Sequence, residues 1–205
     1  MIFKEEVRDL FTVPQGYMLA HCISADFNLG GGIARQFCEH YDMKNRLICG
    51  FGEDFQDIGT SLQIDNVHNL VTKRYVKDKP TYSNLRNALE NMRFAMRLDG
   101  QKKVAMPRIG CGLDGLDWQI VKAIIKDVFE DTDIEILICI REEDLPVCKD
   151  TEYDEDDKIS EYECDCAECN DCQVDSNEEE CVWTTEELKN IYNAILDRLE
   201  EKRNK

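Results

Sequence analysis

Residues 106–118 of the chain read Met-Pro-Arg-Ile-Gly-Cys-Gly-Leu-Asp-Gly-Leu-Asp-Trp. An apolar run from Val104 to Met106 leads into a loop with three glycines among six residues, and the pattern predicts that a helix begins near Asp117. Glycines at a strand-to-helix junction let backbone N–H groups surround an anion, because they tolerate positive φ and have no Cβ. The loop also carries one carboxylate, Asp114. A phosphate-binding loop that contains an acid indicates a site where chemistry is done on a phosphorylated ligand.

A second glycine loop lies upstream. Residues 17–23, Tyr-Met-Leu-Ala-His-Cys-Ile, read as a buried strand, and residues 28–34, Asn-Leu-Gly-Gly-Gly-Ile-Ala, open a helix. This order of strand, glycine loop and helix N-terminus binds phosphate through free amides and the helix dipole. Either cluster alone is more often a tight turn. Two of them in one small domain fit the two phosphates of a nucleotide diphosphate.

Alternating apolar runs and helical stretches predict the fold class. Strands are expected at Tyr17–Ile23, Ser61–Ile64, Leu70–Thr72, Val104–Met106 and Ile134–Ile140. The clearest helix runs from about Thr81 to Leu98, with Pro80 in its first turn and Gly100 ending it. Such alternation predicts an α/β domain in which a mostly parallel sheet lies between two helical layers. Ligands of these sheets bind beyond the carboxyl ends of the strands, where both glycine loops are expected.

The net charge of −18 is distributed unevenly along the 205 residues. Residues 1–140 hold 17 Lys/Arg against 20 Asp/Glu, whereas residues 141–181 hold 3 against 18. The chain has no apolar run near 18 residues and no N-terminal signal pattern, so we expect an intracellular protein, cytoplasmic or nuclear, that does not associate with a membrane. We therefore divide the chain into a domain, residues 1–141, an acidic and disordered linker, residues 142–182, and an amphipathic helix, residues 183–203.

The linker holds four closely spaced cysteines, Cys164, Cys166, Cys169 and Cys172. Four thiolates could complete a zinc tetrahedron, but zinc sites usually use two separated pairs of ligands. Free thiols are favoured, and we assign no metal and no cofactor. The C-terminal helix begins at a capping box and carries an apolar stripe. That stripe needs a surface to bury it, on this domain, on a second copy or on a partner protein.

Six motifs follow one another along the chain: Arg8-Asp9-Leu10-Phe11, Ala20-His21-Cys22-Ile23-Ser24, Gly30-Gly31-Gly32-Ile33-Ala34, Thr72-Lys73, Lys79-Pro80-Thr81-Tyr82 and Met106 to Asp114. Over about residues 1–140 the chain resembles macrodomains of the terminal ADP-ribose protein glycohydrolase type, which are also O-acyl-ADP-ribose deacylases. The resemblance implies a three-layer macrodomain fold. It also implies removal of terminal mono-ADP-ribose from glutamate or aspartate esters of proteins.

By this resemblance, Lys73 is the nucleophile that attacks C1″ of the distal, ring-opened ribose, and Asp114 is the general acid/base. A lysine nucleophile needs a neutral amine, which partial desolvation favours and a neighbouring carboxylate opposes. We therefore expect Asp114 to act as a proton acceptor at the sugar rather than as a simple salt-bridge partner. Without the resemblance, Lys73 would read as an ordinary cation at a strand end.

The resemblance also implies the residues that bind ADP-ribose. Asp9 and Leu10 lie at the adenine, and Ser24 lies near the phosphates. The remaining residues line the diphosphate and the distal ribose: Gly30, Gly31, Gly32, Ile33, Arg108, Ile109, Gly110, Cys111, Gly112 and Leu113. We interpret Cys111 and His21 as packing residues. Three residues depart from the family pattern, namely Arg8, Gly31 and Arg141.

Two other functions stay open at this stage. One is an ADP-ribose reader without turnover, which the presence of both Lys73 and Asp114 disfavours. The other is a hydrolase of ADP-ribosylated nucleic acid, the only form in which a nucleic-acid partner is expected. A near-neutral domain followed by an acidic segment weakly disfavours it, because phosphate binding draws on clustered Lys and Arg.

We predict that the residues after 141 are dispensable for catalysis, because every matched motif precedes them. Truncation after Arg141 should leave ADP-ribose affinity and turnover within a few-fold of the full chain, measured by calorimetry and a hydrolysis assay. A truncated domain that folds but is inactive would refute this division of the chain.

Overall fold

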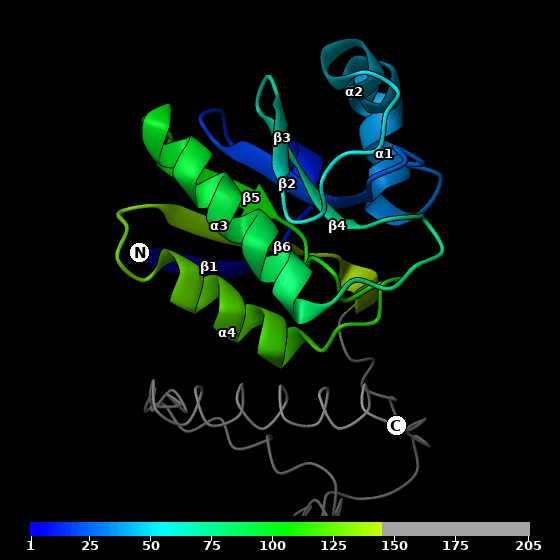
Figure 1. Cartoon of the computed structure of the whole chain (residues 1–205). Coiled ribbons are helices and arrows are strands. Elements are labelled where there is room, and N and C mark those ends of the chain that lie inside the picture. Colours follow the sequence, from blue (N-terminus) through cyan, green and yellow to red (C-terminus); the bar gives the residue numbers. More distant parts are fainter. Residues whose placement is uncertain (145–205) are drawn as a thin grey trace, which may run out of the picture. The chain divides into compact units, whose positions relative to one another are not determined.

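The computed structural model describes residues 1–144, which form one mixed sheet between helices (Figure 1). The strands are β1 Ile2–Val7, β2 Met18–Ser24, β3 Ser61–Ile64, β4 Val67–Lys73, β5 Lys103–Met106 and β6 Glu135–Ile140. Their order across the sheet is β1-β6-β5-β2-β4-β3. Neighbouring strands are parallel except β3, which runs antiparallel to β4 at one edge. The predicted mostly parallel sheet is confirmed.

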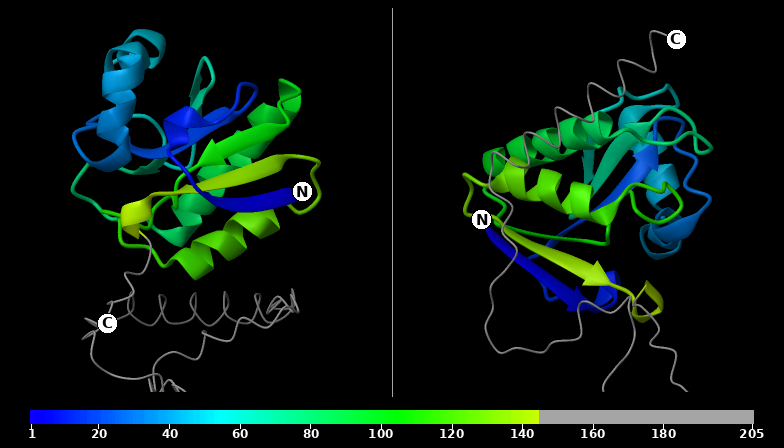
Figure 2. Two further views of the ribbon diagram at one scale, coloured as in Figure 1. Left: turned by 180° about the vertical axis from the view of Figure 1, so that it is seen from behind. Right: turned by 90° about the horizontal axis from the view of Figure 1, so that it is seen from below.

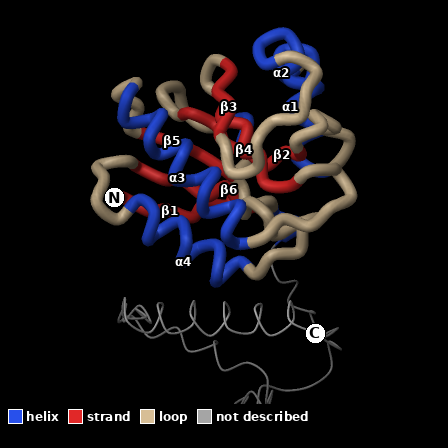
Figure 3. The backbone as a smooth tube through the Cα atoms, in the orientation of Figure 1, coloured by secondary structure: helices blue, strands red, loops and turns tan. Residues whose placement is uncertain are grey.

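Helices cover both faces of this sheet (Figure 2, Figure 3). They are α1 Gly32–Tyr41, α2 Met43–Phe51, α3 Tyr82–Leu98 and α4 Trp118–Phe129, with short 3-10 turns η1 at Leu10–Thr12 and η2 at Glu142–Asp144. One core cluster joins α3 and α4 to the sheet, and the other joins α1 and α2 to its opposite face. The three-layer architecture of a macrodomain is therefore present in the described residues.

Side chains that alternate along the strands contribute to both core clusters. On β4, Leu70 packs in the cluster under α3 and α4, and Val71 packs in the cluster under α1 and α2. Both side chains are fully buried. Successive side chains of a strand point to opposite faces, so a strand covered on both faces is buried along its length. β4 accordingly also buries the polar side chains of His68, Asn69 and Thr72.

The helix α3 forms largely as its sequence predicts. The Thr81 side chain caps it by accepting a hydrogen bond from the Asn84 amide at 3.1 Å. Its apolar stripe, Leu85, Leu89, Met92 and Met96, is fully buried, and Gly100 follows its end at a φ of +67°. One detail differs: Pro80 precedes the capping residue and does not lie in the first turn.

Two elements were not predicted from the sequence. The strand β1 is an edge strand rich in charge, where Lys4 pairs with Glu135 at 2.7 Å and Glu5 pairs with Lys122 at 2.6 Å. Because these charges face solvent or partners, β1 lacks the apolar run of a central strand. Helix α2 follows α1 after Asp42 alone, which adopts the left-handed conformation at φ 50°. Because a single residue separates the two helices, no loop-like stretch of sequence marks where α1 ends and α2 begins.

The remaining sequence predictions lie outside the described residues. These are the linker beyond residue 144, the helix over residues 183–203 and the four cysteines Cys164 to Cys172. Among residues 1–144, no helix is both long and apolar enough to cross a membrane.

The buried stripe of α3 generates a stability prediction. Met92→Ala should lower the free energy of unfolding by about 2–5 kcal/mol, because it leaves a cavity between the helix and the sheet. Phe94, on the same helix, is 62% exposed, so Phe94→Ala should change stability by less than about 0.5 kcal/mol. Denaturant unfolding of both variants checks this, and equal effects would contradict the placement of α3.

Candidate active site

A cleft of about 1610 Å³ lies along the carboxyl ends of the parallel strands. Its walls come from the ends of β1, β2, β4 and β6, the glycine loop before α1, the segment from Lys73 to Lys79 and the loop between β5 and α4. Both glycine loops thus open onto one cavity, as the fold class predicts.

The structure brings most of the predicted site residues into this cleft. The lining includes Asp9, Leu10, Ser24, Gly31, Gly32, Ile33, Lys73, Arg108, Ile109, Gly110, Cys111, Gly112, Leu113 and Asp114. Gly30 is not among the lining residues. A Cβ on Gly30 would lie 3.1 Å from Oδ1 of the exposed Asn28 side chain.

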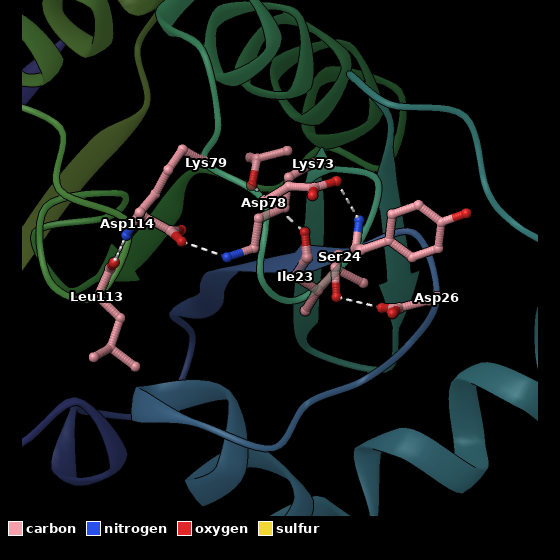
Figure 4. Close-up of polar contacts among 10 residues, drawn as sticks. Ile23, Ser24, Asp26, Lys73, Asp78, Lys79, Leu113 and Asp114 are labelled. Carbon is pink, nitrogen blue, oxygen red and sulfur yellow. Dashed lines mark hydrogen bonds and ion pairs between the residues drawn. The ribbon is translucent and has the colours of Figure 1, made fainter.

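Lys73 and Asp114 form an ion pair inside the cleft (Figure 4). The Lys73 ammonium donates to Oδ1 of Asp114, and the two side chains are only 12% and 14% exposed. From the sequence, Asp114 is expected to be a proton acceptor at the sugar rather than a salt-bridge partner, whereas in the structure its carboxylate is paired with the Lys73 ammonium. The pair joins the end of β4 to the loop after β5 across the cleft.

The end of β4 is held firmly. Lys73 is the last residue of the strand, and the register between β2 and β4 shifts at Ile23 and Ser24. The Ala25 amide donates to the Lys73 carbonyl at 2.9 Å. The Ile23 carbonyl, labelled in Figure 4, accepts from Thr72 Oγ1 at 3.5 Å. An irregularity of this kind re-aims a side chain at a strand end.

The loop that carries Asp114 depends on glycine at its base. Gly110 has a φ of +73°, and a Cβ there would lie 2.8 Å from Leu116 Cδ1. The Leu116 amide donates to the Gly110 carbonyl at 2.9 Å and closes the base of the loop. A side chain at this φ would be strained, and its Cβ would also displace the Leu116 side chain, so the base of the loop favours glycine.

The two glycine loops approach each other at Leu113. A Cβ on Gly31 would lie 3.3 Å from Leu113 Cδ1, although the Leu113 side chain is 74% exposed. Gly31 is also the N-cap of α1 and makes no side-chain capping bond. The first amides of α1 therefore lack a side-chain cap at an end that favours an anion.

Two of the predicted ligand-binding side chains, Asp9 and Ser24, have hydrogen-bond partners within the protein, and a third, Leu10, is buried. Asp9 Oδ1 accepts from the Phe11 amide at 2.9 Å and caps η1, while Leu10 is 4% exposed. Ser24 Oγ donates to Asp26 Oδ1 at 2.5 Å (Figure 4). A ligand would thus meet the second oxygen of Asp9 and the lone pairs of the Ser24 hydroxyl.

The three cysteines that line the cleft, Cys22, Cys111 and Cys139, fit packing better than nucleophilic roles. Burial raises the pKa of the Cys111 and Cys139 thiols to about 11 and that of Cys22 to about 12. Cys111 Sγ donates to the Ile109 carbonyl at 3.3 Å. Neutral, hydrogen-bonded thiols are poor nucleophiles. Among residues 1–144, no group of three His, Cys, Asp or Glu side chains could hold a metal ion.

His21 lies in the core of the domain. Its Nε2 is 2.8 Å from Asn69 Oδ1, and its ring stacks on Phe37 of α1 with centroids 3.9 Å apart. Burial lowers its pKa to about 4, so the ring is neutral near pH 7 and takes no part in proton transfer.

Sequence reasoning gave no roles to several residues of the cleft. Lys79 donates to the Leu113 carbonyl at 2.5 Å (Figure 4). Trp118 lines the cleft too, and its ring centroid lies 5.6 Å from the guanidinium of Arg108, a residue expected to bind ADP-ribose. Arg8 and Arg141, noted only as departures from a pattern, both line the cleft. For Lys79, the sequence offered one indication of a role, its place at the start of the motif Lys-Pro-Thr-Tyr.

The sheet topology, with two glycine loops at one cleft beyond the carboxyl ends of the parallel strands, defines a three-layer α/β domain. The family model described as Macro domain matches residues 16–125. The chain belongs to the macrodomain family.

Relatives refine this placement. The chain is 41% identical over 130 residues to a protein of Bos taurus named ADP-ribose glycohydrolase OARD1. The matched residues cover 63% of this chain and 86% of that protein. The Homo sapiens protein of the same name is 39% identical over the same length and coverage. Among solved structures, the macrodomain of Mycobacterium tuberculosis DarG has a TM-score of 0.61 at 23% identity, covering 67% of this chain and 97% of that one. This last similarity concerns the fold.

The buried imidazole of His21 generates a prediction of pH dependence. Above pH 6.5 the ring is neutral in the folded and unfolded chains and contributes nothing. As the pH falls from 6.5 to about 4, the unfolded chain binds a proton that the folded chain does not, so stability drops by roughly 3 kcal/mol.

His21→Gln keeps a polar group at this position and should flatten that part of the stability profile. His40→Gln, on an exposed residue of α1, is the matched control. Denaturant unfolding at several pH values measures both variants. An unchanged slope in His21→Gln would contradict a neutral, buried ring.

Proposed function

We propose that the domain cleaves the ester between ADP-ribose and a glutamate or aspartate side chain of a protein, and also deacylates O-acyl-ADP-ribose. Membership of the macrodomain family and about 40% identity to two proteins named ADP-ribose glycohydrolases support a hydrolase of ADP-ribose derivatives. The particular linkage is our inference from the family resemblance, and the paired amine and carboxylate of the cleft support it.

The observation that carries the proposal is the ion pair of Lys73 and Asp114 in a cleft between two glycine loops. The amides at the start of α1 and along the loop after β5 suit the diphosphate. With the diphosphate there, the distal ribose lies near the pair, and the adenosine extends toward Asp9 and Leu10. A binding module needs no paired amine and carboxylate at this point.

The first chemical step uses the hydrogen bond already present. The Lys73 ammonium passes a proton to Asp114, which leaves a neutral amine with a lone pair. The amine forms a bond to C1″ as the C1″–O bond to the acceptor breaks, and the carboxylate of the acceptor leaves with the electron pair. The result is a covalent lysyl–ADP-ribose adduct.

The second step hydrolyses the adduct and regenerates the free enzyme. Water adds at C1″, and the bond between C1″ and the Lys73 nitrogen breaks. Asp114, protonated in the first step, returns that proton to the departing amine, and as a carboxylate it takes a proton from the attacking water. Release of this last proton to solvent restores the ion pair. The products are ADP-ribose and the free carboxylate of the acceptor.

Binding and chemistry should therefore separate in variants of this pair. Lys73→Ala and Asp114→Ala should each lower the turnover of a glutamate-linked ADP-ribosyl peptide by roughly 10²–10⁴-fold, while free ADP-ribose still binds by calorimetry. Asp114→Ala should also accumulate the adduct, visible by intact-protein mass spectrometry. Lys102→Ala, at an exposed pair with Asp133, should behave as wild type.

A fully active Lys73→Ala protein would refute the covalent mechanism and leave Asp114 to activate a water directly. A substrate panel tests the linkage: ADP-ribosyl-glutamate, ADP-ribosyl-serine, O-acetyl-ADP-ribose and ADP-ribosylated DNA. Turnover of the DNA substrate alone, or binding without turnover of any, would contradict the proposed substrate class.

A further inference from the structure

The tip of the loop that carries Asp114, residues 112–114, is attached to one neighbouring segment through two lysines. Lys73 donates to the Asp114 carboxylate, and Lys79 donates to the Leu113 carbonyl at 2.5 Å (Figure 4). Within residues 1–144, these are the hydrogen bonds by which the tip reaches another segment. The two lysines thus hold adjacent residues of the loop.

The backbone that presents Lys79 is well fixed. The Tyr75 amide donates to Asp78 Oδ2 at 2.9 Å, and the Asp78 amide donates to the Tyr75 carbonyl at 3.0 Å. These reciprocal bonds close a turn that brings Lys79 back toward the loop. Buried Pro80 and the capping residue Thr81 follow directly, so Lys79 extends from the rigid start of α3.

Within the loop, the tip is held by one backbone bond, from the Gly115 amide to the Gly112 carbonyl at 3.1 Å. The tip begins at Gly112 and is followed by Gly115, and a Cβ at either glycine would meet no atom within 4 Å. Glycine loses more conformational freedom on ordering than any other residue. The base of the loop is closed at Gly110 and Leu116, and the Asp117 amide donates to the Tyr82 hydroxyl at 3.1 Å. The base is fixed, whereas the position of Asp114 depends on the bonds at the tip.

The proposed mechanism breaks one of those two bonds. When the Lys73 amine bonds to C1″, it no longer pairs with Asp114, and the tip loses its ion pair during the second step. We propose that Lys79 is a positioning residue for that step. Its bond to the Leu113 carbonyl keeps Asp114 within reach of the adduct until water has resolved it. This inference rests on the proposed function.

The consequence is specific to one step. Lys79→Met removes the donor and keeps the aliphatic chain, so the adduct should form but resolve slowly. Since a misplacement of about 1 Å can cost 10²-fold in rate, we expect turnover to fall roughly tenfold to a hundredfold. ADP-ribose affinity should stay within about twofold, because the amides of the glycine loops are untouched.

The experiment compares Lys79→Met, Lys79→Arg and Lys102→Met in the full chain, with a glutamate-linked ADP-ribosyl peptide as substrate. Lys102 donates to Asp133 at 2.8 Å on the surface and matches the loss of one exposed, bonded ammonium. Turnover, ADP-ribose binding and the adduct fraction under quenched turnover are measured for each. We expect adduct to accumulate only in Lys79→Met and turnover to recover in Lys79→Arg.

Three results would overturn the role of Lys79. One is a Lys79→Met protein with wild-type turnover and no added adduct. Another is weakened ADP-ribose binding with no adduct, which would make Lys79 a ligand contact. The third is equal loss in Lys102→Met. The Lys73→Ala variant separates the two proposals: if it is active, the covalent mechanism fails, whereas an inactive Lys73→Ala with an unaffected Lys79→Met removes only the positioning role.

Discussion

The ion pair between Lys73 and Asp114 is the contact on which the cleft depends. It joins the end of a central strand to a glycine loop 41 residues further along the chain, and both side chains are mostly shielded from solvent. Taking two charges out of water costs several kcal/mol per ion, and attraction within the pair offsets this only when the geometry is good. A pair placed there adds little to stability, so we infer that it is kept for its chemistry. The fixed end of β4 and the closed base at Gly110 supply the geometry.

The arrangement also solves an electrostatic problem. A carboxylate beside bound phosphates would repel them, yet catalysis needs a proton acceptor near the distal ribose. The ammonium of Lys73 neutralises Asp114 in the cleft. In the proposed mechanism, backbone amides of the two glycine loops bind the diphosphate without adding a full charge, and the same ammonium becomes the nucleophile once its proton has moved to Asp114. In this account, one ion pair both neutralises the Asp114 carboxylate and supplies the nucleophile.

Much of this organisation can be read from the sequence, and the remainder has physical reasons for escaping it. The glycine loops and the α3 stripe follow from local rules of backbone freedom and periodicity. The edge strand β1 escaped because its charges pair with Glu135 and Lys122, which are distant in sequence. The meeting of Lys73 with Asp114 came from family resemblance, since no local rule gives a distance between two loops. The bond from Lys79 to a backbone carbonyl could not be found at all, because every residue offers such an acceptor.

The most direct test of the account is to trap the covalent adduct on the unmodified enzyme. The ring-opened form of a lysyl–ADP-ribose adduct is an imine at C1″, which cyanoborohydride reduces to a stable secondary amine. Wild-type protein would be mixed with ADP-ribosyl-glutamate peptide and cyanoborohydride, digested, and mapped by tandem mass spectrometry. The account predicts one ADP-ribosyl modification, on Lys73. A modification on another residue, or full turnover with none, would contradict it.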